Sequence, residues 1–551
     1  GMAALMAFAA RARKMRPPGL PARHCTSGRE RRSKGSRMTG RLKARESGVA
    51  RDGDDSKAET PASGPLPRGP GLIESLADDM LDSVDRLRAA AAEPFEPTLR
   101  LGVTGLSGAG KSVFITALVA SLLSRERLRA MPAAAEGRIT GAVLRPQPDA
   151  GVPRFAYEAH RGVLQGTPPQ WPGGTRSVSQ LRLALRIRSA GYVQSFFEAV
   201  YEPLLGPRTL NLDITDYPGE WLLDLPLLEQ DYETWAAGAL AAASAAGRRA
   251  HAAGWETALR SVEPGGAHDE SVAVRLADAY RGYLEACRAA GFSALAPGRF
   301  LMPGDFEGSP ALSFAPLPRP EKASGRRSDT LWGQMKIRYD AYKRLIVKPF
   351  FRDHFARLDR QVVLVDALSA LARGPEALRD LTAAMAETLA CFRHGRASWF
   401  DRLLGGRRID KLLFAASKAD LLHHSQHARL TGLVEAMLAE AAERAAFSGA
   451  TVRGMAIAAV RSTSEQEIER DGRTLNLVRG KRADGKELAL FPGSLPSDPG
   501  LLLRGDWAAL MGDANTDAFA RVAFRPPEWG AGGPPHIRLD AALDWLMGDR
   551  L

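Results

Sequence analysis

Short segments in which apolar and polar residues alternate recur along the chain, and each predicts a β-strand. The alternation is most regular over 178–187 and 209–216, where leucine and isoleucine recur at every second position. Continuous apolar runs, typical of strands buried on both faces of a parallel sheet, occur at 99–105, 362–368, 411–420 and 454–460. Apolar residues three or four apart predict helices between them, notably over 111–128, 375–392 and 426–446. This alternation of strands and helices predicts an α/β fold.

The stretch between the strand that ends at Asp216 and the strand that begins at Val362 has helical character. It predicts a large helical insertion within the α/β core. Near the C-terminus, two alternating runs flank Asp484 and Gly485, a pair favoured in the tight turn of a β-hairpin. A last helix is expected over 538–547. The α/β core is therefore expected to carry a C-terminal extension made of a β-hairpin and a helix.

The N-terminal segment differs from the rest of the chain. Residues 1–70 are rich in Arg, Gly, Pro and Ser without a sustained apolar period, so we expect a disordered basic tail. Helical periodicity begins at Leu72. The predicted organisation has five parts: the tail (1–70), the N-terminal part of the core (71–221), the mainly helical insertion (222–360), the C-terminal part of the core (361–465) and the hairpin-and-helix extension (466–551).

Composition narrows the class of protein. Of the 551 residues, 45% are hydrophobic and 25% are charged, which is the mix of a chain that buries a core and excludes a wholly disordered or collagen-like protein. The formal net charge is +12, but residues 2–37 alone contain ten Lys and Arg against one acidic residue. The rest of the chain is only slightly basic, so we do not expect nucleic-acid binding.

Membrane and disulfide signals are weak. No apolar run reaches the ~20 residues that a membrane-spanning helix needs. Cys25, Cys287 and Cys391 are far apart and lack metal-ligand spacing, which predicts free thiols and no structural zinc site. We therefore expect a cytoplasmic protein without a transmembrane segment.

A glycine-rich motif predicts a phosphate-binding site. Residues 105–112, Gly-Leu-Ser-Gly-Ala-Gly-Lys-Ser, match the G-x-x-x-x-G-K-[ST] phosphate loop and lie between a predicted strand and a predicted helix. The glycines let backbone N–H groups turn toward a phosphate at the N-terminus of the helix. Lys111 is expected to reach the β- and γ-phosphates and assist catalysis, and Ser112 to bind Mg²⁺. The predicted nucleotide-binding residues here are Gly105, Ser107, Gly108, Ala109, Gly110, Lys111, Ser112 and Val113.

A second motif supplies a carboxylate for the metal. Asp216 ends a predicted strand and opens Asp-Tyr-Pro-Gly, a D-x-x-G element. Asp216 is expected to hold the Mg²⁺ water shell, and Gly219 could offer its N–H to the γ-phosphate. Glu220 follows directly, where it could orient the attacking water or could equally be a surface charge. Thr175 is the best candidate for the switch threonine that binds Mg²⁺ and assists catalysis, with Thr140 as the alternative.

A third motif is expected to recognise the base of the nucleotide. Ser417-Lys-Ala-Asp420 resembles the [NT]-K-x-D motif, in which the carboxylate accepts two hydrogen bonds from guanine, with Ser in place of the usual Asn or Thr. Adenine has no such pair of donors on that edge, so Asp420 is expected to select guanine, with Lys418 beside it. After the next strand, Arg461 and Ser462 occupy the position of a further base-contacting loop.

The combined motifs resemble the YcjX-like family of bacterial P-loop NTPases. The segments that carry the resemblance are GLSGAGKSVF, WPGGT, DYPGEW, VVLVDAL, SKAD, AAVRST and PHIRLDAALDWL, and it extends over roughly 72–551. The resemblance implies a cytoplasmic, stress-associated nucleotide-binding protein with a Ras-like P-loop NTPase core and a large helical insertion. Members are often labelled ATPases, whereas Asp420 favours guanine in this chain.

The sequence therefore predicts a GTPase that cleaves the β–γ phosphoanhydride with GTP or GDP and Mg²⁺ as ligands, acting as a nucleotide switch in a bacterial stress-associated process. Two alternatives stay open. The first is an ATPase on the same scaffold, with ATP in place of GTP. The second is a nucleotide-gated interaction protein with negligible hydrolysis, whose helical insertion binds a protein effector.

Overall fold

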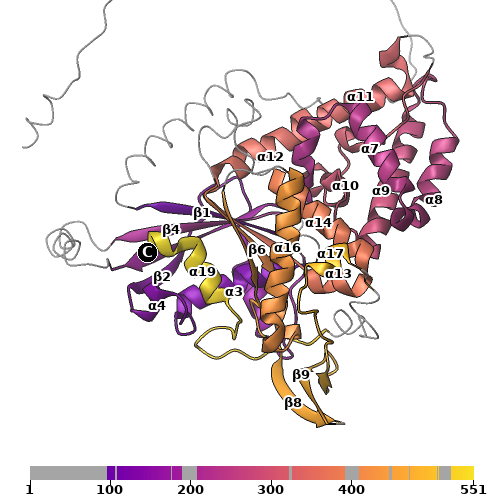
Figure 1. The fold of residues 1–551 in the computed structure, drawn as a ribbon. Helices are drawn as coiled ribbons and strands as arrows, with labels where there is room; N and C mark the ends of the chain where they lie inside the picture. The colour runs from indigo at the N-terminus through magenta and orange to yellow at the C-terminus, as the bar shows by residue number, and fades with distance from the viewer. Residues whose placement is uncertain are drawn as a thin grey trace, which may run out of the picture. The chain divides into compact units, whose positions relative to one another are not determined.

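The structure is a computed structural model that describes residues 96–105, 108–174, 177–188, 208–321, 326–390, 409–445, 450–470, 472–505, 507 and 523–551. The tail predicted over 1–70 and the helix predicted from Leu72 lie outside these residues. Seven of the described strands form one sheet in the order β2-β3-β4-β1-β5-β6-β7 (Figure 1). Their bounds are β1 (Thr98–Gly105), β2 (Ile139–Arg145), β3 (Ser179–Ile187), β4 (Thr209–Asp216), β5 (Arg360–Val365), β6 (Lys411–Ala416) and β7 (Thr451–Ala456).

The main sheet is parallel except at one edge. Each neighbouring pair from β4 through β1, β5 and β6 to β7 is parallel, whereas β3 runs antiparallel to β4 and β2 antiparallel to β3. The mixed α/β architecture with a mainly parallel central sheet is therefore confirmed. Because β1, β4, β5 and β6 are parallel neighbours, their carboxyl ends lie at the same edge of the sheet, where ligands of open α/β sheets bind.

Several predicted strand boundaries need correction. The strand predicted over 362–368 ends at Val365, because Asp366 begins α13 (Ala367–Arg373) by accepting the N–H of Ser369 at 3.0 Å. The strands predicted to reach Asp420 and Val460 end at Ala416 and Ala456. Strand β2 was not predicted, since its residues are mostly half-buried at the sheet edge and the apolar alternation is broken by Gly141.

Helices cover both faces of the main sheet (Figure 1). Side chains alternate between the faces along each strand. Val362 of β5 packs in the cluster that contains α3 (Lys111–Ser124) and α19 (Leu539–Met547). Its neighbour Val363 packs in the cluster that contains α13, α14 (Pro375–Ala390) and α16 (His427–Ala445). The sheet thus lies between two helical layers.

The chain between β4 and β5 forms a series of helices: η2 (Gly219–Leu228), α7 (Tyr232–Ser244), α8 (Ala246–Arg260), α9 (Glu270–Ala290), α10 (Gly298–Leu301), η3 (Gly304–Phe306), η4 (Pro310–Leu312), η5 (Arg327–Asp329), α11 (Leu331–Tyr342), the π-helical η6 (Lys343–Val347), α12 (Lys348–Asp353) and η7 (Phe355–Arg357). Their core is rich in aromatic residues. Trp235 stacks on Tyr339 with ring centroids 5.0 Å apart, and Phe314 packs edge-on against both. These contacts join α7 to α11.

A smaller antiparallel sheet follows the main one, in the order β10-β9-β8. Strands β9 (Arg473–Lys481) and β10 (Glu487–Leu490) flank Asp484 and Gly485, where the sequence predicts a hairpin. Strand β8 (Ser464–Arg470) was not predicted and crosses the expected boundary at 465. The remaining short helices are α4 (Pro132–Ala135), α5 (Tyr157–Leu164), η8 (Ala419–Leu421), η9 (His424–Gln426), α17 (Leu501–Arg504) and η11 (Gly548–Arg550).

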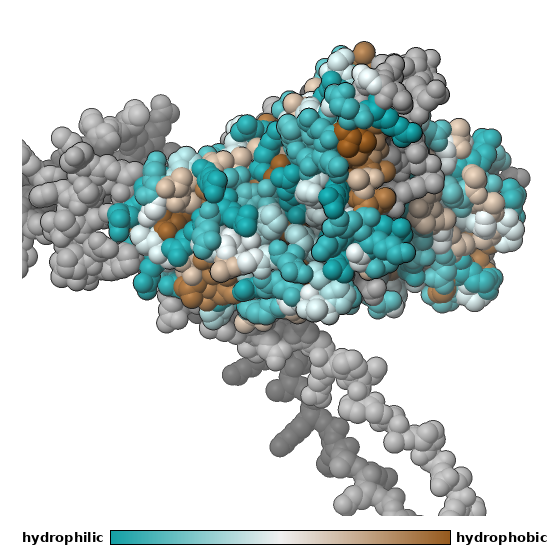
Figure 2. Space-filling model, turned by 90° about the horizontal axis from the view of Figure 1, so that it is seen from below, coloured by the Kyte–Doolittle hydropathy of each residue, from teal (hydrophilic) through white to brown (hydrophobic). Residues whose placement is uncertain are grey.

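The surface is mixed in character. The face shown in Figure 2 is mainly hydrophilic, and its hydrophobic residues form small separate groups. Large exposed apolar side chains occur on several elements, for example Val143 on β2 and Ile337 on α11. Among the described helices, none is both long and apolar enough to cross a bilayer.

Candidate functional site

The glycine-rich segment between β1 and α3 has an open concave backbone. Gly108 and Gly110 have φ of +79° and +86°, a left-handed conformation that favours glycine, and a Cβ at either position would meet no atom of the described residues within 4 Å. Gly110 is the N-cap of α3, and within the part of the chain that the structure describes no side chain caps this helix. The first-turn N–H groups and the positive end of the helix dipole are therefore available to an anion.

The neighbouring residues fix this segment to the sheet. Gly105 ends β1 so close to β5 that a Cβ there would lie 2.8 Å from Cβ of Leu364. Lys111 begins α3, and its Nζ donates to the carbonyl oxygen of Gly105 at 3.0 Å. The Lys111 ammonium thus folds back over the glycine-rich segment. Ser107 lies outside the described residues.

Residues 171–174, which precede the predicted switch threonine, lie against the start of α3. The hydroxyl of the buried Ser112 donates to the carbonyl oxygen of Gly173 at 3.3 Å. Thr175 itself lies outside the described residues. The alternative, Thr140, is exposed on β2 and its hydroxyl donates to the carbonyl oxygen of Arg186 on β3. Thr140 is thus part of the sheet edge, which disfavours it as a switch residue.

Asp216 is the last residue of β4 and is 1% exposed. It is in register with Val103 of β1, so it lies at the same sheet edge as the glycine-rich segment. The hydroxyl of Thr104 donates to the carbonyl oxygen of Tyr217 at 3.0 Å, and the Tyr217 hydroxyl donates to Gln361 at 2.8 Å. These bonds fix the D-x-x-G element to β1 and β5.

Gly219 and Glu220 begin η2, directly after the D-x-x-G turn. Glu220 is buried, and its Oε2 has no hydrogen-bond partner within the part of the chain that the structure describes. The backbone of Gly298 on α10 approaches the Glu220 carbonyl so closely that a Cβ would overlap it. Glu220 is thus not the surface charge that one reading of the sequence allowed.

The rest of η2 is anchored in the helices that follow it. Asp224 accepts the N–H of Gly298 at 2.6 Å and the hydroxyl of Tyr342 at 2.7 Å. The guanidinium of Arg299 lies 3.2 Å from the ring centroid of Trp221, a cation–π contact. Burial raises the pKa of the Asp224 carboxyl to about 6, although the hydrogen bonds from Tyr342 and Gly298 oppose the shift. The D-x-x-G element and these helices therefore form one packed unit.

The predicted base-recognition residues lie after β6 and β7. Asp420 is buried in η8, and its Oδ2 accepts the backbone N–H of Ser462 at 2.8 Å and the Ser462 hydroxyl at 2.6 Å. Burial raises the pKa of Asp420, while the bonds from Ser462 act in the opposite direction. Lys418 has φ of +61°, and its Nζ lies 2.5 Å from Oδ2 of Asp366.

The Arg461 side chain is directed toward Thr463 and Glu465. Its Nε donates to the carbonyl oxygen of Thr463 at 3.0 Å, and its Nη2 contacts Glu465 at 3.1 Å. Ser417 donates from its hydroxyl to the carbonyl oxygen of Val365 at 3.3 Å. Serine at this motif position thus serves to link β6 to β5.

A cavity of about 400 Å³ joins these elements. A volume of this size is within the usual range for small-molecule sites. Its lining includes nine of the predicted binding residues: Gly108, Ala109, Gly110, Lys111, Ser112, Val113, Lys418, Asp420 and Ser462. Residues from opposite parts of the chain therefore meet around one cavity, as the phosphate and base motifs predict.

Other predicted residues do not line this cavity. Asp216, Gly219 and Glu220 lie at the neighbouring strand end, and the Arg461 side chain turns toward β8. Several residues of the lining were not predicted as site residues. Trp171 and Phe524 contribute to the cavity, and the Trp171 indole N–H donates to the Phe524 carbonyl oxygen at 2.7 Å. Trp171 belongs to the segment WPGGT noted in the sequence, but its pairing with Phe524 has no local signal because the two residues meet only in the folded chain.

Comparison with known proteins gives consistent matches. Residues 99–551 match the model of the YcjX-like family, DUF463. The chain is 38% identical over 480 residues to the Ras-like GTPase YcjX of Escherichia coli (strain K12), covering 85% of this chain and 99% of the relative. It is 37% identical over 476 residues to the Ras-like GTPase YcjX of Shewanella oneidensis (strain MR-1), covering 82% and 94%.

Proposed function

The chain belongs to the YcjX-like family, and we propose that it is a Mg²⁺-dependent GTPase that hydrolyses the β–γ phosphoanhydride of GTP. The main support for this proposal is that a single cavity is lined both by the phosphate motif and by Asp420 and Ser462 of the base-recognition segments. Both relatives are named Ras-like GTPases, which supports guanine nucleotides over ATP.

Phosphate binding rests on the backbone. Gly108 and Gly110 leave open space where a side chain would stand, and the uncapped N-terminus of α3 supplies N–H donors. On nucleotide binding, the Lys111 ammonium group would leave the Gly105 carbonyl oxygen and contact the β- and γ-phosphates instead. This exchange keeps the ammonium group hydrogen-bonded in both states.

The oxygen donors near the phosphate loop fit magnesium. Ser112 supplies a hydroxyl at the first turn of α3, and Asp216 supplies a carboxylate at the adjacent strand end. Mg²⁺ prefers such oxygen ligands and keeps several waters, which suits one hydroxyl and one carboxylate. Bound Mg²⁺ would neutralise charge on the β- and γ-phosphates. Thr175 would add a ligand from the segment that follows Gly173.

The hydrolytic step needs a positioned water. We assign this role to Glu220, because its buried Oε2 can accept a hydrogen bond from water beside the D-x-x-G turn. Gly219 would donate its N–H to the γ-phosphate. Loss of the γ-phosphate would then release the start of η2, which is anchored through Asp224 to α10 and α11.

This connection also supports a switch role. The helices between β4 and β5 would carry the nucleotide state to a protein effector in a stress-associated process of the bacterial cytoplasm, as the family resemblance implies. A nucleotide-gated interaction protein would use the same link from η2 to the helices, but it would not hydrolyse the nucleotide. An ATPase would share the phosphate loop but would not need Asp420.

Single-turnover hydrolysis separates these functions. We expect Mg²⁺-dependent conversion of GTP to GDP, much slower conversion of ATP, and loss of both with Glu220→Ala while GDP still binds. Glu229→Ala, which changes the residue just after η2, is the matched control. Tight GTP binding without turnover would favour the interaction protein, and faster ATP turnover would favour the ATPase.

A further inference from the structure

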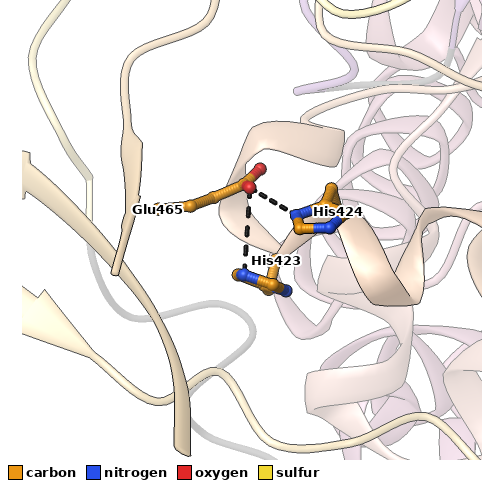
Figure 3. A group of neighbouring side chains, drawn as sticks. All are labelled: His423, His424 and Glu465. Atoms are coloured by element: carbon orange, nitrogen blue, oxygen red, sulfur yellow. Dashed lines mark hydrogen bonds and ion pairs between the residues drawn. The ribbon is translucent and has the colours of Figure 1, made fainter. Parts of the chain in front are cut away.

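A second group of ligand-forming side chains lies a few residues beyond Asp420. His423 and His424 occupy the turn that leads into α16, and Glu465 of β8 points toward both (Figure 3). One nitrogen or oxygen atom from each of these three residues lies within 4.8 Å of the others. His424 Nδ1 lies 2.5 Å from Glu465 Oε2, and His423 Nε2 lies 3.8 Å from the same oxygen.

A second carboxylate lies beside His423. Glu467 is two residues after Glu465 on β8, so both side chains project from the same face of the strand. Its Oε1 lies 3.7 Å from His423 Nε2. Glu467 therefore adds a carboxylate next to His423, outside the set of three atoms that lie within 4.8 Å of one another.

His423 is anchored through one ring nitrogen and turns the other toward two carboxylates. The side chain is 3% exposed, so its ring is held in place by its surroundings. The shorter contact of Nδ1 is with the Ser425 hydroxyl at 3.0 Å, and that hydroxyl is also 3.4 Å from the Asn476 amide of β9. His423 Nδ1 also accepts the backbone N–H of Ser425 at 3.4 Å, so the proton of the neutral ring lies on Nε2, which faces the two carboxylates. A metal ion bound at Nε2 would displace that proton.

Two of the contacts leave room for a metal ion, whereas His424 Nδ1 and Glu465 Oε2 are hydrogen-bonded at 2.5 Å and would have to separate to bind the same ion. Separations of 3.7 and 3.8 Å are too long for hydrogen bonds. They are near the roughly 3.3 Å that separates nitrogen and oxygen ligands around tetrahedral Zn²⁺. Arg461 offsets the charge of Glu465 only in part, since it contacts Oε1 and leaves Oε2 to the histidines.

We propose that His423, His424, Glu465 and Glu467 form a binding site for a divalent transition ion of the Zn²⁺ class. Imidazole and carboxylate ligands suit such ions, and none of the three cysteines is needed. The ion would join β8 to the turn that follows the base-recognition motif. Glu465 also contacts Arg461, next to Ser462, so an occupied site would stiffen the loop that orients Asp420.

Metal titration of the full chain, free of any affinity tag and nucleotide, tests the site. We expect one equivalent of Zn²⁺ to bind by calorimetry, and Co²⁺ at the same site to give the strong visible absorption of four-coordinate cobalt. His424→Ala and Glu465→Gln should each weaken Zn²⁺ binding by roughly 10-fold or more and abolish the cobalt band. The control is His268→Ala, which removes an imidazole beside the single carboxylate of Glu270.

Folding of each variant is checked by circular dichroism, and Glu467→Gln provides a third variant on the exposed side of the group. Weaker zinc binding in the folded variants, with unchanged binding in the His268 control, supports the site. Absence of stoichiometric binding in the wild type overturns it. Equal zinc affinity in the wild type and all three variants overturns it as well.

Discussion

Ser462 donates two hydrogen bonds, from its backbone N–H and its hydroxyl, to the same carboxylate oxygen of Asp420. Both bonds converge on Oδ2, at 2.8 and 2.6 Å, and hold the buried carboxylate in one orientation at the cavity wall. A carboxylate fixed in this way is suited to accept the paired donors of a guanine edge. The orientation, as well as the presence, of Asp420 therefore matters for the proposed base selectivity.

Ser462→Ala tests this relationship. The variant keeps the backbone bond and loses the hydroxyl bond, so we expect GDP affinity to fall by about 10-fold, in line with a hydrogen bond to a charged group. Calorimetric titration measures the change. Ser464→Ala is the matched control, because that exposed hydroxyl contacts the Arg479 carbonyl of β9. Equal affinities in the two variants would count against the role of Ser462.

Lys111→Ala tests the phosphate site. The side chain donates to the Gly105 carbonyl within the same segment and joins no distant parts of the fold through this bond, so its loss should leave the melting temperature nearly unchanged. Nucleotide affinity should fall by 10²-fold or more, on the order expected for losing a charged contact to phosphate. Lys336→Ala, on the exposed side of α11, is the control. Unchanged GTP affinity in Lys111→Ala would remove the phosphate loop from the site.

Asp216→Asn tests the metal shell. Because Mg²⁺ bridges the β- and γ-phosphates of a triphosphate, the variant should lose more Mg²⁺-dependent affinity for a non-hydrolysable GTP analogue than for GDP. Titrations with and without Mg²⁺ give the comparison. Equal losses for both nucleotides would mean that Asp216 only supports the turn after β4.

Asp224 should make stability depend on pH. Burial raises its pKa from 3.8 to about 6 in the folded protein, so the folded state holds the proton more tightly than the unfolded state. The resulting stabilisation is complete below pH 3.8 and is lost as the pH rises through about 6, by about 3 kcal/mol in total. Asp224→Asn removes this titration and keeps an acceptor oxygen for Gly298.

The measurement is the difference in melting temperature between Asp224→Asn and the wild type. We expect the variant to gain stability relative to the wild type between pH 4.5 and pH 7. A constant difference across this range would show that Asp224 does not titrate as described.

Regular periodicity made much of the fold predictable. The alternation over 209–216 predicted β4 with its exact bounds, because Leu210, Leu212 and Ile214 are all buried in one core. Strand β8, with the sequence Ser-Glu-Gln-Glu-Ile-Glu-Arg, gave no such signal because its side chains are largely exposed. The end of β5 was misplaced because Asp366 is a helix cap that an apolar run conceals.

The candidate site was predictable where the backbone imposes a motif. The phosphate loop needs glycine at Gly108 and Gly110, so its sequence is recognisable without a structure. The contacts of Trp171 with Phe524, and of Glu220 with Gly298, depend on residues distant in the chain. Sequence alone therefore identified the two motifs that line the cavity, but not its full lining or the burial of Glu220.

A calorimetric titration of the wild type with GDP and with ADP tests most directly whether Asp420 makes this protein a guanine-nucleotide enzyme. We expect GDP to bind tighter by roughly 10²-fold or more, since the wrong base leaves a buried carboxylate unpaired. Asp420→Asn should lower GDP affinity and raise affinity for xanthosine diphosphate, whose C2 carbonyl can accept from the new amide. Equal affinity of the wild type for ADP and GDP, or no gain for the xanthine nucleotide in the variant, would contradict the claim.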